Sequence, residues 1–261
     1  MKKFISMFIS ALLALAACCV FVSCNEPTPP AGEGGLTKAE ISSLYSQIAS
    51  DAWEKIDVAE PTEQAAAVSL MSVTDVPDKT VEATDANAIK NVKLNAVAMP
   101  AFLKMLSNLY ANDNFVLSDG IVKFNATITL GGQQFAQKFA LTSSIDQTNG
   151  KVYFEVTVEV NGATQYNLCD IDYDFTAKKI TAFRYCAAMP GFFADMKVDA
   201  QDKMYIYQTS DAADAFAVAI SAKKTDFETS SEQGQVLTAD FSSEVQSYMD
   251  TVNAAMASFR N

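Results

Sequence analysis

The sequence predicts an α+β fold, an antiparallel β-meander of five or six strands whose single apolar face is covered by helices from the N- and C-terminal parts of the chain. Three observations predict it. Residues 121–189 alternate apolar and polar side chains, as half-buried antiparallel strands do. Gly131-Gly132 and Asn161-Gly162 are two-residue hairpin signals within this region. Apolar residues at helical spacing flank it on both sides.

The first 23 residues have the parts of a secretory signal peptide. Lys2 and Lys3 supply positive charge, and residues 4–22 are apolar except for two serines. Phe21-Val22-Ser23-Cys24 resembles the lipobox of bacterial lipoproteins. In that family the cysteine receives fatty acyl chains such as palmitate and becomes the new N-terminus. The resemblance implies that Cys24 is lipidated and that the protein is anchored to a Gram-negative outer membrane, on its periplasmic or its exposed side.

Two alternatives stay open for this segment. Leu15-Ala16-Ala17-Cys18 also resembles a lipobox, and cleavage there would leave an apolar stub on the mature protein. The apolar stretch is also just long enough to remain as an uncleaved spanning helix. Residues 24–35 are rich in Pro and Gly and predict a tether reaching about 20 Å. Residues 36–261 then form one domain, since 261 residues with 49% hydrophobic composition allow a sizeable core.

Composition excludes several classes of function. The chain has no histidine, which removes the commonest zinc ligand and the Ser-His-Asp and Cys-His nucleophile systems. A net charge of −12 disfavours nucleic acid and anionic lipid surfaces as partners, so the membrane link is expected to be covalent. We therefore expect no cofactor and no metal, and a role that is not enzymatic.

Two helices are predicted before the strands. Thr37 and Glu40 form a capping box, and apolar residues continue at helical spacing to residue 56. Residues 63–72 are compatible with a short helix, and a further helix is expected over about 96–110.

The hairpin signals fix the register of the first strand with the second and of the third with the fourth, because a two-residue loop sets the pairing on either side of it. The inner face of the fourth strand, which ends near residue 175, then carries Cys169 and Ile171, and its outer face carries Asp170, Asp172 and Asp174. The expected pairs are Leu130 with Gln133, Ile128 with Phe135, Phe124 with Phe139, Val160 with Ala163, Phe154 with Cys169 and Val152 with Ile171.

The remaining elements are less strongly patterned. A fifth strand is expected over 180–189 and a sixth over 204–208, followed by an Ala-rich helix over 211–224. Asp240 can cap a last helix. Its apolar stripe, interpreted as core, consists of Phe241, Val245, Tyr248, Met249, Val252, Met256 and Phe259.

Cys169 and Cys186 are the cysteines beyond the signal region, and an exported chain with two of them suggests a disulfide. An even loop after the fourth strand would set them opposite each other. An odd loop or a bulge would instead turn Phe183 and Tyr185 inward, bring Arg184 out beside Asp172 and separate the cysteines onto opposite faces. The second register avoids a buried arginine on the apolar face and is favoured.

Asp170, Asp172 and Asp174 are candidates for a surface site. Alternate strand residues lie about 6.5–7 Å apart, which is too far for one calcium ion to gather all three, so no metal site is predicted. Tyr153 and Tyr166 share the outer face with these aspartates and could form a carbohydrate platform. Coverage by another element or plain exposure is the more ordinary interpretation of such residues.

These observations lead to a non-catalytic envelope module that binds a glycan, an envelope protein or another ligand, or has a structural role. The alternative is a carrier of an apolar ligand, because a curved antiparallel sheet covered by helices can enclose a pocket. A carboxylate-based glycosidase is disfavoured.

Overall fold

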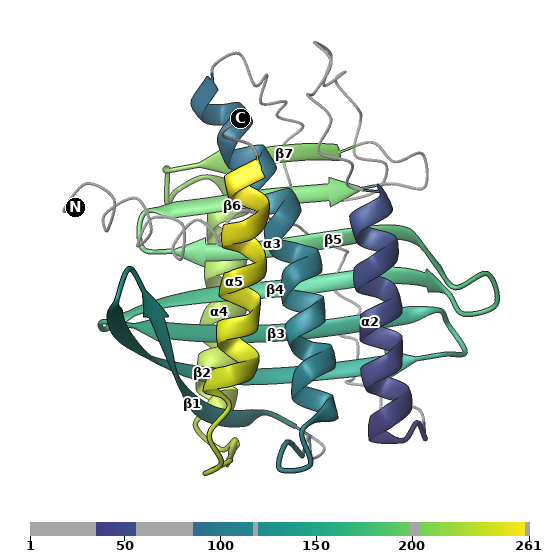
Figure 1. Ribbon diagram of the computed structural model, residues 1–261. Helices are drawn as coiled ribbons and strands as arrows, with labels where there is room; N and C mark the ends of the chain where they lie inside the picture. Colours follow the sequence, from purple (N-terminus) through teal and green to yellow (C-terminus); the bar gives the residue numbers. More distant parts are fainter. Residues whose placement is uncertain (1–34, 56–85, 117–119, 199–203, 259–261) are drawn as a thin grey trace.

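The computed structural model describes residues 35–55, 86–116, 120–198 and 204–258 (Figure 1). The signal, Cys18, Cys24, nearly all of the tether and the short helix expected over 63–72 lie outside these residues. The elements follow one another as α2 (Lys38–Lys55), α3 (Ala86–Ala111), β1 (Val122–Leu130), β2 (Gln133–Asp146), β3 (Lys151–Val160), β4 (Ala163–Asp174), β5 (Lys179–Met189), β6 (Phe192–Val198), β7 (Met204–Thr209), α4 (Ala215–Ser231), β8 (Gln235–Val236) and α5 (Ser242–Ser258).

One eight-stranded sheet organises the domain, with strand order β7-β6-β5-β4-β3-β2-β1-β8. Strands β1 to β7 form an antiparallel meander, and the two-residue β8 pairs in parallel with β1. The predicted α+β class and the antiparallel sheet are confirmed. The predicted strand number was too low, because β6 and β8 were not expected.

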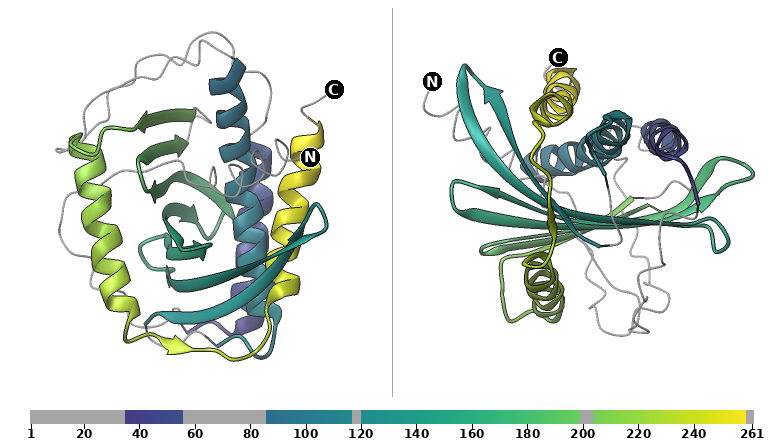
Figure 2. Two further views of the ribbon diagram at one scale, coloured as in Figure 1. Left: turned by 90° about the vertical axis from the view of Figure 1, so that its left-hand side faces the viewer. Right: turned by 90° about the horizontal axis from the view of Figure 1, so that it is seen from below.

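The sheet is covered on both faces. Helices α2, α3 and α5 lie side by side on one face and α4 lies on the other (Figure 2). The expectation of a single apolar face was therefore wrong. On the α4 face, Tyr166 and Leu168 of β4 and Phe193 of β6 pack with Phe216 and Phe227 of α4. A strand buried on both faces does not show clean alternation, which is why β4 carries apolar residues at outward positions.

Both tight hairpins have the predicted register, and all six expected pairs are observed. Gly131 and Gly132 have φ of 55° and 80°, and Asn161 and Gly162 have φ of 52° and 79°. Two consecutive residues with positive φ are what a type I′ turn requires, and Gly and Asn tolerate that conformation best. The local chemistry of these turns thus sets the alignment of β1 with β2 and of β3 with β4.

The pairing of β4 with β5 follows the favoured register. A bulge between Asp172 and Tyr173 shifts the alignment by one residue. Phe183 and Tyr185 consequently face the helices and are buried in the main core. Arg184 pairs with Asp170 rather than lying beside Asp172.

The predicted helices α2, α4 and α5 are present. The Thr37–Glu40 capping box forms, with the Thr37 N–H donating to Glu40 Oε2 at 2.7 Å and the Glu40 N–H donating to Thr37 Oγ1 at 3.3 Å. Helix α3 begins at Ala86, ten residues before the expected start at 96. The polar composition of this first part hid it, although Ala, Lys and Asn do not break a helix.

The main core lies between the sheet and α2, α3 and α5. Phe102 of α3 stacks on Phe154 of β3 with ring centroids 5.1 Å apart, and Phe124 stacks on Phe139 at 4.8 Å. The predicted stripe of α5 faces this core: Phe241, Val245, Tyr248, Met249 and Val252 are all buried. Among the described residues, none of the helices combines the length and the apolar character that crossing a membrane requires.

The outer edge of β1 is closed by side chains and by β8. The Thr127 N–H donates to Ser242 Oγ at 2.8 Å, and the Thr129 N–H donates to Gln246 Oε1 at 2.7 Å. At the other end of β1, the Gln235 N–H donates to the Ile121 carbonyl at 2.8 Å. An open strand edge is a template for unwanted pairing, and α5 and β8 together remove it.

Candidate functional site: an apolar pocket between the sheet and helices α3 and α5

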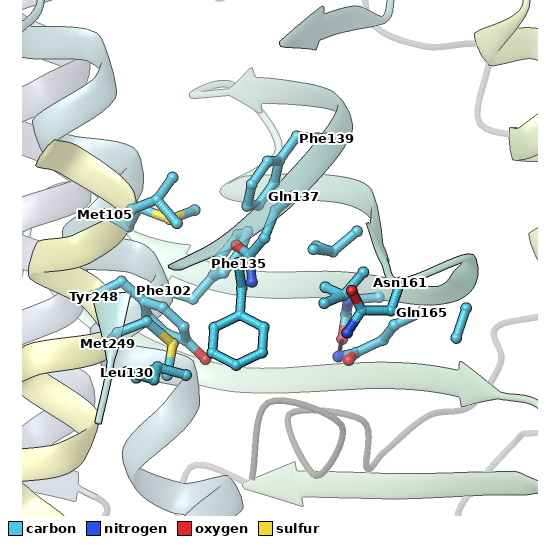
Figure 3. A pocket seen from close by; sticks show the side chains of 15 residues that line it. Phe102, Met105, Leu130, Phe135, Gln137, Phe139, Asn161, Gln165, Tyr248 and Met249 are labelled. Atoms are coloured by element: carbon cyan, nitrogen blue, oxygen red, sulfur yellow. Dashed lines mark hydrogen bonds between the residues drawn. The ribbon is translucent and has the colours of Figure 1, made fainter. Parts of the chain in front are cut away.

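A pocket with a cavity volume of about 200 Å³ lies between α3, α5 and the ends of strands β1 to β4 (Figure 3). The β1–β2 hairpin curls out of the plane of the sheet toward α5 (Figure 2). The residues that line the pocket come from six elements and one turn. They are Phe102, Met105, Leu130, Phe135, Gln137, Phe139, Val158, Val160, Asn161, Ala163, Gln165, Asn167, Val245, Tyr248 and Met249.

Most of this lining is apolar. Phe102, Phe135 and Phe139 contribute aromatic rings, and Met105 and Met249 contribute flexible thioether chains. Within the part of the chain that the structure describes, no charged side chain lines the pocket. The cavity is therefore suited to a molecule without net charge, because a bare ion would lose its hydration without gaining a counter-ion.

Four amide side chains belong to the lining, and three of them are buried. Gln137, Gln165 and Asn167 are 3%, 6% and 2% exposed, so they are effectively inside the protein. Gln165 Nε2 donates to Asn167 Oδ1 at 2.9 Å, and the Tyr185 hydroxyl donates to the same oxygen at 3.2 Å. These two bonds hold the side-chain amides of Gln165 and Asn167 in place.

Tyr248 projects from α5 into the pocket (Figure 3). Its side chain is buried, at 6% exposure, and among the described residues its hydroxyl has no hydrogen-bond partner. Burial, and after it the neighbouring Tyr185, raises the pKa of Tyr248 well above the ordinary tyrosine value. The hydroxyl thus stays protonated and has an unused hydrogen-bond donor.

The outer end of the pocket lies at the β3–β4 turn. Asn161 is exposed there, and Val158, Val160, Ala163 and Phe135 are only partly buried. A ligand can therefore enter from this end without unfolding the helices.

The aspartates of β4 do not contribute to this pocket. Asp170 and Asp172 both pair with Lys151, the former at 3.5 Å, and Asp174 Oδ1 accepts the N–H groups of Thr176 and Ala177 at 2.8 Å each. Burial raises the pKa of Asp170, and Lys151 opposes this shift. Burial would lower the pKa of Lys151, but its bonds to the two aspartates outweigh that effect and leave the pKa raised. Structural pairing thus accounts for all three carboxylates.

The two tyrosines proposed for a surface platform lie beneath or beside α4. Tyr166 is fully buried, so it offers no exposed ring to a sugar, and Tyr153 packs at the edge of the same cluster. The Tyr166 hydroxyl donates to Glu155 Oε1 at 2.6 Å. Burial raises the pKa of Glu155, although its hydrogen bonds with Tyr166 and Tyr153 oppose the shift. The platform hypothesis is therefore wrong for Tyr166, and the more ordinary interpretation, coverage by another element, holds, with α4 as that element.

The two cysteines of the domain are adjacent in the sheet but not opposite each other. Cys169 pairs with Tyr185, and Cys186 pairs with Leu168. The direct pairing that the disulfide hypothesis needed is not observed, because the bulge shifts the register by one residue. Cys169 itself is buried in the main core.

Sequence reasoning named none of the pocket residues as a site. One signal was available: Gln137 lies between Phe135 and Phe139 at an inward position, and Gln165 and Asn167 lie at inward positions of β4. Buried polar residues at core-facing positions are unusual, so they single out positions to examine as a candidate site.

Fold and pocket together define a class: a three-layer domain with helices on both faces of an antiparallel sheet and an uncharged cavity beside one helix layer. No protein-family model, curated protein or solved structure matches this chain. Within the described residues, no three acidic, cysteine or histidine side chains are grouped so that they could hold a metal ion.

Proposed function

We propose that this domain binds a small apolar molecule in the pocket between the sheet and helices α3 and α5, as a non-catalytic binding protein held at the cell envelope by a lipid anchor. The observation that supports binding is the cavity of about 200 Å³ with its uncharged, largely aromatic and aliphatic lining. For comparison, an engineered cavity of about 150 Å³ lined by apolar side chains stays dry and takes up benzene.

The envelope part of the proposal rests on the lipobox-like segment ending at Cys24 and on the tether that follows it. An acidic chain with net charge −12 gains nothing from anionic lipid, so an acyl anchor is the physically consistent attachment. An anchored binding domain of this kind would hold its ligand near the membrane and outside the bilayer.

Binding of alkylbenzenes tests the proposal. Toluene, ethylbenzene, propylbenzene and butylbenzene differ only in apolar length, and each methylene buried contributes about 0.8 kcal/mol. We expect the affinity measured by calorimetry to rise by about fourfold per methylene until the cavity is full, with a parallel rise in melting temperature.

A pocket-filling variant provides the specificity control. Val158 lines the pocket on β3, and Val158→Phe places extra volume in the cavity. Val218 is 53% exposed on α4, so Val218→Phe makes the same change far from the pocket. Val158→Phe should abolish alkylbenzene binding and Val218→Phe should leave it intact. Equal binding to both variants, or no binding to the wild-type protein, contradicts the proposal.

A further inference from the structure

The polar part of the pocket gives information about the chemistry of the ligand. Tyr248 lines the cavity, and its buried hydroxyl has no hydrogen-bond partner among the described residues, while Asn167 and Gln165 form a fixed amide pair in the same lining. A buried donor without a partner costs free energy in the empty protein, and beside a cavity a bound ligand can supply that partner.

We propose that the ligand is neutral and carries a hydrogen-bond acceptor, such as a carbonyl, ether or hydroxyl oxygen, to which the Tyr248 hydroxyl donates. This inference rests on the proposed function, since it concerns the same pocket. It specifies an apolar body with one uncharged oxygen and excludes carboxylates and phosphates as the buried group.

The neighbourhood of Tyr248 explains why the acceptor should be neutral. The pocket that Tyr248 lines contains Phe102, Phe135 and Met105 among its apolar side chains and Gln165 and Asn167 among its polar ones. Asn167 Oδ1 already accepts two hydrogen bonds. Among the described lining residues no Lys or Arg is available to pair with an anion, and the desolvation of an unpaired carboxylate would exceed the gain from one neutral donor.

A matched set of four probes separates the alternatives. Butylbenzene supplies the apolar body alone, butyrophenone adds a carbonyl to the same carbon skeleton, and 4-phenylbutyrate adds an anionic group. The fourth probe, 4-phenyl-2-butanone, is an isomer of butyrophenone with the carbonyl at another position of the side chain. With two carbonyl positions tested, one of the two ketones can reach the fixed Tyr248 hydroxyl. Affinities are measured by calorimetry on the full mature protein.

Tyr248→Phe removes the donor and keeps the ring. We expect it to weaken at least one of the two ketones by about three- to tenfold relative to butylbenzene, the range expected for one neutral hydrogen bond. Butylbenzene itself should bind at least as tightly as before, and 4-phenylbutyrate should bind neither protein.

Tyr173→Phe is the matched control. The Tyr173 hydroxyl is also buried without a hydrogen-bond partner among the described residues, but Tyr173 does not line the pocket. This variant should leave the binding of every probe unchanged. The comparison therefore separates recognition of the ligand by Tyr248 from a general effect of deleting a buried hydroxyl. Thermal unfolding confirms that both variants fold.

Each outcome has a defined meaning. If butylbenzene binds and Tyr248→Phe changes neither ketone relative to it, the inference about the acceptor is overturned while the proposed function stands. If 4-phenylbutyrate binds as tightly as the ketones, the neutrality of the ligand is overturned. If no probe binds the wild-type protein, the proposed function itself fails, and this inference fails with it.

Discussion

At the scale of single residues, Glu155 is the carboxylate whose surroundings oppose its charge most clearly. It lies on the face of the sheet that α4 covers, and the Tyr166 hydroxyl donates to it at 2.6 Å. Burial raises the pKa of Glu155 even though Tyr166, Tyr153 and Lys223 favour the ionised form. The folded protein is therefore more stable when the side chain at this position is neutral.

Glu155→Gln should therefore stabilise the protein in a pH-dependent way. A carboxyl whose pKa is raised on folding contributes its stability below the unfolded-state pKa and loses it as the pH rises through the folded-state pKa. The variant should match the wild-type free energy of unfolding near pH 4 and exceed it increasingly toward neutral pH. Urea unfolding across this pH range measures the difference in free energy of unfolding between the variant and the wild type. The contributions of carboxylates that both proteins share cancel in this difference.

Glu159→Gln is the control for this experiment. Glu159 is four residues along the same strand and pairs with Lys138 at 2.7 Å on the surface. Its replacement should change stability by less than about 1 kcal/mol, as is usual for an exposed pair. A Glu155→Gln variant less stable than wild type at neutral pH would show that the ionised carboxylate is needed beneath α4.

At the scale of elements, α5 closes the edge of β1 with side chains rather than with another strand. Gln246 accepts from the Thr129 N–H at 2.7 Å and its amide also reaches the Thr129 carbonyl at 3.4 Å. One glutamine thus replaces a strand partner for one residue of β1.

Gln246→Ala should cost about 0.5–1.5 kcal/mol of stability, the net value of such a hydrogen bond. The amide hydrogen of Thr129 should also exchange faster, while amides in the centre of β3 keep their protection. Gln47→Ala is a matched change on α2, where Gln47 bonds only to Ser43 within its own helix at 3.2 Å. Unchanged exchange at Thr129 would mean that the bond to Gln246 does not protect this edge.

Element-scale patterns also explain how much of the fold was predictable. The turns Gly131-Gly132 and Asn161-Gly162 encode their own geometry, so the register of β1 with β2 and of β3 with β4 followed from local chemistry alone. The bulge between Asp172 and Tyr173 was predicted only as one of two alternatives, because burial of Arg184 depends on partners that sequence spacing does not specify. The first turns of α3 were missed because Ile89, Val92 and Leu94 are interspersed with Asn and Lys and do not form an unambiguous helical stripe.

The pocket could not be predicted as a unit. Its lining residues come from α3, β1, β2, β3, β4 and α5 and from the β3–β4 turn, and they meet only because the β1–β2 hairpin curls toward α5. The stripe on α5 was correctly interpreted as core, and Tyr248 within it also faces the cavity. Deviations of a few ångströms between packed layers create such cavities, and the hydrophobic pattern does not encode them.

At the scale of the whole molecule, the binding domain and its attachment are separate functions of one chain. The described domain begins at residue 35, after the segment that resembles a lipoprotein signal. Net charge of −12 gives the protein no electrostatic attraction to anionic lipid, so in the proposed function attachment depends on acylation of the cysteine. A mature chain that lacks both the signal segment and the acyl chains should therefore leave the membrane without unfolding.

Cys24→Ala and Cys18→Ala distinguish the two candidate lipidation sites. We expect Cys24→Ala to incorporate no labelled palmitate, to keep its first residues and to lose the acyl anchor, whereas Cys18→Ala should be processed and lipidated as in the wild type. Stable anchoring takes two acyl chains. Because the Cys24→Ala protein would carry none at this position, nearly all of the acyl-anchored protein should disappear. Label on Cys24→Ala and none on Cys18→Ala would move the site to Cys18 and leave the residues between the two cysteines on the mature protein. Label on neither the wild-type protein nor the variants would contradict the lipid anchor and leave the pocket as the part of the proposal that stands independently.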